Sequence, residues 1–202
     1  MSTHLTRRQP RAWGRGCRRR TGGFTLAELL ITVAVIGILS AVAVNVLGVR
    51  EWQRSRVNAV AMELNGWLEA VRRSALKGTG CRVTIQTASA AAAGAVIASA
   101  APVTNAAVTV PNTCMSQQPL RILSNAGNDV FAISSDPATF TFTPRGTARG
   151  LSNGTENDLE IRIALNGGLP MRCVQLTSPL GVVRIGYNDT AVNGTCLYPG
   201  SF

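Results

Sequence analysis

The sequence predicts an α+β protein in which a long N-terminal helix packs on a β-rich globular domain. Three observations predict this fold class. A nearly uncharged apolar segment covers residues 24–44, an amphipathic helical repeat covers residues 49–80, and short Val-, Ile- and Thr-rich runs alternate with turn residues from Cys81 onward. The chain has 202 residues, 46% of them hydrophobic, which is enough to bury a core of its own.

The basic residues are concentrated at the N-terminus. The formal net charge is +10, and seven of the 20 Lys and Arg residues precede Gly23 with no acidic residue among them. From Phe24 onward, 13 basic residues stand against 10 acidic ones, so the excess of positive charge does not by itself indicate a nucleic-acid binder. The one histidine, His4, also lies in this basic head. An ordinary histidine-based catalytic or metal site is therefore excluded.

Residues 24–44 contain a single charged residue, Glu28. As a helix this segment is about 30 Å long, enough to cross a bilayer core, and the preceding arginines would remain in the cytoplasm. A secretory signal has a shorter apolar stretch and a small-residue cleavage site. A plain membrane anchor does not explain a carboxylate, which costs about 2.5–3.5 kcal/mol deep in a bilayer. We therefore expect Glu28 to have a partner.

The residues that follow the basic head form a recognisable motif. The order G-F-T-L-x-E-L-L, after an arginine-rich leader and at the start of an apolar helix, resembles the processing and methylation site of type IV pilins and type II secretion pseudopilins. The resemblance implies that prepilin peptidase removes residues 1–23 by cutting between Gly23 and Phe24, and that Phe24 is then N-methylated. It also implies that residues 24–48 form a transmembrane and assembly helix, in which Glu28 neutralises the new ammonium group of a neighbouring subunit.

The helix is predicted to continue through residues 49–80 as an amphipathic helix. Apolar residues recur at helical spacing, arginines fall mostly between them, and Gly78 and Gly80 provide a C-terminal stop. The recurring residues are Val49, Trp52, Val57, Val60, Leu64, Trp67, Leu68, Val71 and Ala75. The two tryptophans are interpreted as core or interface residues, not as part of a cofactor site.

Residues 81–202 are predicted to form a β-rich domain. Its strand candidates, separated by Gly, Asn, Asp and Pro clusters, are CRVTIQ, VFAI, TFTFT, LEIRIAL, CVQLT and VVRIGY. Strict alternation of apolar and other side chains in residues 159–165 predicts one buried and one solvated face. The alanine-rich tract at residues 87–110 is predicted to contain a strand and a variable loop.

Four cysteines follow the leader, and they are Cys81, Cys114, Cys173 and Cys196. They lack C-x-x-C spacing and a neighbouring histidine, so no zinc site, and no cofactor, is expected. An even number of cysteines in an exported domain favours disulfides, for which three pairings are open. We favour the pairs Cys81–Cys114 and Cys173–Cys196, because each closes a local loop without crossing the other.

Three further blocks resemble the GspH/FimT family of minor pseudopilins and minor type IV pilins. They are L-x-x-W-L-x-x-V-R-R-S-A-L-K-G at residues 64–78, F-x-F-T-P-R-G at 140–146 and S-P-L-G-V-V-R at 178–184. The resemblance implies a pilin-like fold, with a long N-terminal helix, transmembrane in its first half and amphipathic in its second, packed on a β-rich domain at residues 81–202.

The same resemblance implies a function and a location. The expected function is that of a structural subunit acting in filament initiation or tip assembly beside other major and minor pilins, and thereby in protein secretion or pilus biogenesis. The expected location is the bacterial inner membrane, crossed once, with the C-terminal domain in the periplasm. An enzyme is not expected, because the chain has no Ser/His/Asp set, no phosphate-binding loop and no paired carboxylate motif.

Nucleic acid is the alternative partner. Some FimT-like proteins bind DNA during natural transformation through a C-terminal loop of the form G-R-x-R. The equivalent residues here are Gly181-Val182-Val183-Arg184, so valine replaces one of the two arginines and halves the charge that could neutralise phosphates. Arg145, Arg149 and Arg172 are candidates for a second basic patch, although scattered arginines are more often simply solvated. The structural role is therefore preferred over DNA binding.

Overall fold

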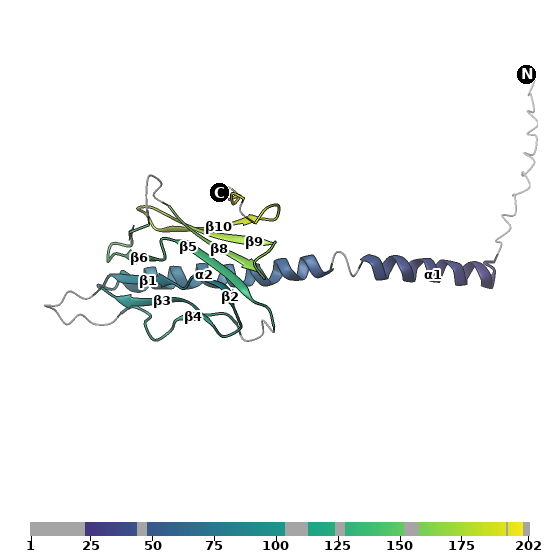
Figure 1. Cartoon of the computed structure of the whole chain (residues 1–202), viewed down its shortest axis with the longest axis horizontal. Helices are drawn as coiled ribbons and strands as arrows, with labels where there is room; N and C mark the ends of the chain where they lie inside the picture. The colour runs from purple at the N-terminus through teal and green to yellow at the C-terminus, as the bar shows by residue number, and fades with distance from the viewer. Residues whose placement is uncertain are drawn as a thin grey trace, which may run out of the picture. The chain divides into compact units, whose positions relative to one another are not determined.

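A computed structural model describes residues 23–43, 48–103, 113–123, 128–151, 158–192 and 194–199 (Figure 1). The chain divides into two compact units, the first ending at Ala43 and the second beginning at Val44. The first unit contains helix α1, and the second contains helix α2 and all the strands described below. This confirms the predicted fold class of an N-terminal helical region followed by a β-rich domain. Residues 1–22 of the leader, including Cys17, lie outside the described residues.

Helix α1 runs from Leu26 to Ala43 and presents apolar side chains in every direction. Leu29, Leu30 and Ile36 are 59–63% exposed within this chain. A helix that is apolar all round is normally buried in a protein core or a membrane. None of the described helices combines the length and apolar character needed to cross a membrane. Residues 44–47, where the sequence predicts that the helix continues, lie outside the described part of the chain.

Helix α2 runs from Val49 to Ala75 and has the predicted amphipathic pattern. Val57, Leu64 and Leu68 are at most 1% exposed and form its buried stripe. Trp67 is 7% exposed, and its indole N–H donates to the carbonyl oxygen of Gln118 at 2.9 Å. Trp52 instead is exposed and lies under the guanidinium of Arg56, 4.4 Å from the ring centroid. Of the two tryptophans, Trp67 therefore belongs to the core.

Helix α2 ends at Ala75, before the glycines that the sequence offers as a stop. The N–H groups of Lys77 and Gly78 donate to the carbonyl oxygens of Ser74 and Ala75, three residues earlier, at 3.1 and 3.3 Å. This spacing is that of a 3₁₀ turn, a common way for a helix to end. Gly78 then adopts φ = 127°, which glycine accepts without a steric penalty. The glycine therefore redirects the chain toward the first strand after the helix has already ended.

The described strands of the second unit form two antiparallel sheets, with the strand orders β4-β3-β1-β6-β7 and β10-β9-β8-β5-β2. The first sheet contains β1 (Cys81–Ile85), β3 (Val96–Pro102), β4 (Leu120–Arg121), β6 (Thr139–Phe142) and β7 (Ala148–Arg149). The second sheet contains β2 (Ala88–Ala91), β5 (Phe131–Asp136), β8 (Leu159–Leu165), β9 (Met171–Thr177) and β10 (Val182–Asn188). Each of the six runs predicted as strands forms a strand.

One core joins helix α2 to both sheets. Leu159, Ile161 and Ile163 of β8 are fully buried, as the alternation of this strand predicts. From the first sheet, Phe142 is also fully buried and meets Phe140 edge to face, with ring centroids 5.3 Å apart. The helix is therefore an integral part of the domain core, which positions its polar residues against the turns of both sheets.

The outer face of β8 is less solvated than its alternation predicts. Ala164 is 7% exposed and belongs to a second apolar cluster with Met171 and Cys173. Cys196 and Tyr198 pack on this cluster from residues 194–199, which we call the C-terminal strap. The prediction of a wet face is wrong here because the strap covers part of it. The alternation of apolar and polar residues identifies the two faces of a strand. It does not show whether a segment distant in the sequence covers one of those faces.

The alanine-rich tract forms strands β2 and β3, with a turn at Gly94, where φ is 80°. Ala98 and Ala100 of β3 are at most 5% exposed and contribute to the main core. The predicted strand is thus confirmed and a second one is added. Residues 104–110, the last part of the tract, lie outside the described residues.

Candidate functional site

Helix α1 begins at the segment that resembles a processing site. Thr25 directly precedes the helix, and Glu28 is its third residue. The backbone N–H and the hydroxyl of Thr25 both donate to Oε2 of Glu28 at 2.9 Å, and the N–H of Glu28 donates to Oγ1 of Thr25 at 3.3 Å. This reciprocal pattern is a capping box, which satisfies N–H groups that a helix start leaves without partners. It holds the Glu28 carboxylate within one turn of Phe24.

The predicted cleavage site is open to solvent in this chain. Gly23 is exposed and Phe24 is 82% exposed. A Cβ atom built on Gly23 would meet no atom within 4 Å, so nothing among the described residues requires glycine at this position. Any requirement for glycine would therefore come from an enzyme that reads the site, not from the fold of the chain.

The three GspH/FimT-like blocks meet at the C-terminal end of α2. Arg72 donates from Nε to the carbonyl oxygen of Gly146 at 3.0 Å and from Nη2 to that of Leu180 at 2.9 Å. Nη1 of the same side chain lies 3.7 Å from Oε1 of Glu69 on the helix. One arginine thus ties the β6–β7 turn and the β9–β10 turn to α2. Because each block supplies one partner, packing of the domain accounts for these contacts.

The two turns also contact each other directly. The N–H of Ala148 donates to the carbonyl oxygen of Pro179 at 2.9 Å. Gly181 has φ = 65°, and a Cβ there would lie 3.3 Å from both the carbonyl oxygen of Gly146 and the ring of Phe142. Glycine therefore meets both a backbone and a packing requirement at this position. The glycine of the candidate DNA-binding loop has a structural role in this fold.

The arginines proposed for DNA binding occupy separate places. Arg145 in the β6–β7 turn and Arg149 in β7 are exposed and line one hollow of 460 Å³. Arg184 is exposed on β10 opposite Gln175 and does not line that hollow. Arg172 is 8% exposed, and its Nη1 donates to Oδ1 of Asp189 at 2.8 Å. The structure brings Arg145 and Arg149 together, leaves Arg184 apart and excludes Arg172 from a surface patch.

The structure contains the disulfides Cys81–Cys114 and Cys173–Cys196, with Cα atoms 5.6 and 6.3 Å apart. This is the favoured pairing. The first bridge lies in the main core beside α2, because both of its cysteines are at most 5% exposed. The second bridge joins β9 to the C-terminal strap. The two bridges therefore hold different parts of the second unit.

Tyr198 adds a second tie between the strap and the sheet. Its hydroxyl donates to Oε2 of Glu160 at 2.6 Å, and Oε1 of the same carboxylate lies 2.6 Å from Nε of Arg162. Burial, and then the hydrogen bond to Glu160, raise the pKa of Tyr198 well above its usual range, so the hydroxyl keeps its proton. A Cβ on Gly186 would lie 2.6 Å from the Tyr198 ring, so the tyrosine packs directly on the backbone of β10.

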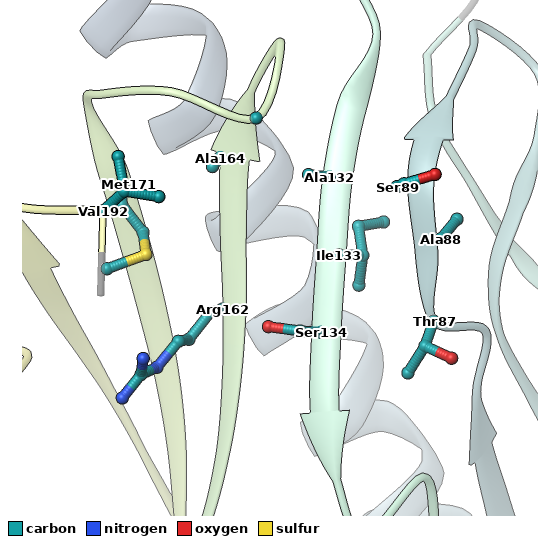
Figure 2. Close-up of a pocket in the computed structure, with 11 residues that line it drawn as sticks. Thr87, Ala88, Ser89, Ala132, Ile133, Ser134, Arg162, Ala164, Met171 and Val192 are labelled. Carbon is teal, nitrogen blue, oxygen red and sulfur yellow. The ribbon is translucent and has the colours of Figure 1, made fainter. Parts of the chain in front are cut away.

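A hollow of 440 Å³ lies on the outer face of the second sheet, over small side chains of β5 and β8. Figure 2 shows Arg162 at one end, Met171 and Val192 along one side and Ser89 on the other. The guanidinium of Arg162 is already paired with Glu160. None of the described residues lining the hollow carries a carboxylate, thiol or imidazole.

Sequence reasoning misses two contacts of these sites. The contact between Thr25 and Glu28 has a readable signal, because T-x-x-E before an apolar run is the sequence form of a capping box. The contacts of Arg72 have no such signal. Its partners, the carbonyl groups of Gly146 and Leu180, are 74 and 108 residues away in the sequence. No local sequence pattern predicts a contact over such a separation.

Comparison with known proteins gives one family match and two structural matches. The model of the prokaryotic N-terminal methylation motif matches residues 18–44. The type IV minor pilin FimU of Pseudomonas aeruginosa is similar in two crystal forms, at 16% and 18% identity and TM-scores of 0.40 and 0.41. These matches cover 71% and 73% of this chain and 98% and 96% of FimU. No match to a curated protein was found.

The matched motif contains Gly23, Phe24 and Glu28, the residues that the sequence singles out for processing and assembly. Helix α1 begins inside the motif, and the second unit combines an amphipathic helix with two antiparallel sheets. The family match is thus to the prokaryotic N-terminal methylation motif, which covers residues 18–44 of this chain.

Proposed function

We propose that this protein is a minor structural subunit of a type IV pilus or a type II secretion pseudopilus, and that it acts in filament initiation or at the filament tip. The observation that carries the proposal is the methylation motif at residues 18–44, which leads into an apolar helix with Glu28 in its first turn. The exposed apolar side chains of α1 support the proposal, because they need lipid or neighbouring helices to cover them.

The proposed location is the bacterial inner membrane, with residues 24–48 as a single anchor and residues 81–202 in the periplasm. The arginine-rich leader supports this orientation, because positively charged flanks remain on the cytoplasmic side. Two disulfides support an oxidising compartment for the domain. The partners that follow from the proposal are prepilin peptidase and other major and minor pilins.

Processing at Gly23 is the first test of this proposal. In cells with prepilin peptidase, mass spectrometry of the membrane protein is expected to find a chain that starts at N-methylated Phe24. Gly23→Ala is expected to be cut poorly, although the substitution meets no steric conflict in the described chain. An uncleaved chain that retains Met1 in peptidase-competent cells would contradict the proposal.

DNA binding for natural transformation is the alternative function. The observation in its favour is that Arg184 is exposed and, within the described residues, has no carboxylate in ion-pair distance. Against it, Val182 stands where the first arginine of the loop is expected, and this valine is 38% exposed. One guanidinium neutralises fewer phosphates than two, so less affinity is gained from counterion release.

Oligonucleotide binding by the full chain in a neutral detergent tests this alternative. We expect weak binding at physiological salt, with the affinity of Arg184→Ala within about twofold of wild type, because one exposed charge contributes little. Titration at several salt concentrations measures how many phosphates are contacted. Tight binding that falls steeply with salt and disappears in Arg184→Ala would make DNA uptake the leading function.

A further inference from the structure

The β6–β7 turn carries a hollow that the proposed assembly function does not use. Its volume is 460 Å³, and two arginines, two threonines and the apolar atoms of two smaller residues line it. These residues are Thr143, Arg145, Thr147, Ala148, Arg149 and Pro179, and we call the site the arginine hollow. No carboxylate is among these lining residues, so the hollow is purely cationic in its formal charge.

Within the described residues, the positive charge of the arginine hollow has no acidic partner. Arg145 and Arg149 are exposed, and neither side chain has an ion-pair or hydrogen-bond partner in the described part of the chain. Five of the other arginines in the second unit do lie within 4.0 Å of a carboxylate, and these are Arg54, Arg56, Arg72, Arg162 and Arg172. The guanidinium groups of the hollow are therefore available to an anion from outside the chain.

A threonine hydroxyl adds a further donor. Oγ1 of Thr143 and Oγ1 of Thr147 are 2.6 Å apart, so one hydroxyl donates to the other. The hydroxyl that accepts keeps its own hydrogen for another acceptor. This hydroxyl hydrogen and the N–H groups of the two arginine side chains place several hydrogen-bond donors around one opening. Such groups bind carboxylate and phosphate oxygens in charge-assisted hydrogen bonds.

The turn is held in place before any ligand binds. The N–H of Thr143 donates to the carbonyl oxygen of Thr147 at 2.8 Å, and Gly146 takes the φ of 78° that the turn needs. Arg72 holds the carbonyl of Gly146, and Ala148 is bonded to the β9–β10 turn. A preorganised site loses less entropy when it binds a ligand.

The surroundings of the hollow favour a protein over a nucleic acid. Leu180, next to Pro179, is 64% exposed, and Leu76 is 53% exposed beside Gly146. Surfaces that bind single-stranded nucleic acid present aromatic side chains to the bases. The neighbouring aromatic residues Phe140 and Phe142 are instead 2% and 0% exposed. The surface therefore combines cationic and aliphatic groups without a stacking platform.

We infer that the arginine hollow binds an acidic segment of a partner protein, in which carboxylate side chains are flanked by aliphatic ones. The carboxylates pair with Arg145 and Arg149, and the aliphatic side chains cover Leu76 and Leu180. Charge complementarity selects the partner, because an acidic side chain finds two unpaired cations here and no competing carboxylate in the lining. This inference concerns the second unit alone and does not depend on which filament the chain joins.

Peptide binding to the full chain in a neutral detergent tests the inference. The probe is a fluorescent peptide with the sequence acetyl-Leu-Asp-Glu-Asp-Leu-amide, and the matched peptide replaces its acids with Asn and Gln. We expect the acidic peptide to bind more tightly than the neutral one, and Arg145→Gln with Arg149→Gln to weaken it about tenfold. Both arginines are exposed and unpaired, so this variant is expected to fold, which intact disulfides and circular dichroism would verify.

A second double variant controls for net charge. Arg50→Gln with Arg184→Gln also removes two exposed cations and is expected to change peptide affinity by less than about twofold. Equal weakening by the two double variants, or no binding of the acidic peptide to wild type, would overturn the inference. A twelve-nucleotide oligothymidine is measured at the same salt. If it binds more tightly than the peptide and loses that affinity in Arg145→Gln with Arg149→Gln, the hollow is a nucleic-acid site and the proposed partner is wrong.

Discussion

The Glu28→Val chain is expected to be inserted and cleaved but to be missing from purified filaments. Removing the one charge from residues 24–44 makes residence in lipid easier, so the first two steps should not suffer. Assembly should fail because the proposed partner of Glu28 is the ammonium of Phe24 on a neighbouring subunit, which would be left unpaired in a low-dielectric environment. Such a loss is more damaging than the absence of both charges.

The capping box complicates this test and also suggests its controls. Glu28 accepts two hydrogen bonds from Thr25, so Glu28→Val removes the helix cap together with the charge. Glu28→Gln separates the two roles, because glutamine can complete a capping box while carrying no charge. Thr25→Ala does the reverse: it keeps the carboxylate and removes the hydroxyl that bonds to it.

The amount of each variant in purified filaments, normalised to its amount in the membrane, measures the effect. If charge pairing governs assembly, Glu28→Gln should be depleted as strongly as Glu28→Val, and Thr25→Ala should be close to wild type. Normal incorporation of Glu28→Gln, with depletion of Thr25→Ala, would show instead that the start of the helix is what assembly requires. Normal incorporation of Glu28→Val would contradict both explanations.

The elements of the fold that depend on local pattern were predictable from the sequence. The run of residues 159–165 alternates so regularly that its strand and its buried face follow directly, and both are confirmed. The repeat in residues 49–80 likewise predicts α2, although the helix ends at Ala75 because the last turn tightens before Gly78 is reached. The exact end of a helix depends on competing hydrogen bonds of nearly equal strength. The spacing of apolar residues does not predict which of these bonds forms.

Contacts between distant segments were not predictable in the same way. Arg72 looks like one more polar residue between the apolar positions of α2, yet it binds the carbonyl groups of two turns. Tyr198 similarly gives no sign that it lies on Gly186 and binds Glu160. The disulfides are the exception, because non-crossing loops limited the pairings enough for the sequence to favour Cys173–Cys196. The contacts of Arg72 and Tyr198 depend on how the chain folds and not on the local sequence around these residues.

Removing the disulfides is expected to lower the stability of the second unit in two different ways. The bridges span 33 and 23 residues, and closing loops of this length contributes about 3–4 kcal/mol to the free energy of unfolding. Cys81→Ala with Cys114→Ala, and Cys173→Ala with Cys196→Ala, should both shift the denaturant midpoint downward. Removing the Cys81–Cys114 bridge should lower the free energy of unfolding more than removing the other bridge, because the loss of its buried sulfur atoms also leaves a gap beside α2.

Local opening should distinguish the two bridges more clearly than global stability does. The strap reaches the sheet through Cys196, through Tyr198 and through the N–H of Leu197, which donates to the carbonyl oxygen of Tyr187 at 2.9 Å. Without the Cys173–Cys196 bridge only short-range contacts remain, so the Leu197 amide should exchange with solvent at a lower opening free energy than the core amides. In Cys81→Ala with Cys114→Ala, the same amide should keep its protection relative to the core. Hydrogen exchange on both variants measures this, and unchanged protection of Leu197 after loss of the strap bridge would show that Tyr198 and the backbone contacts hold the strap without it.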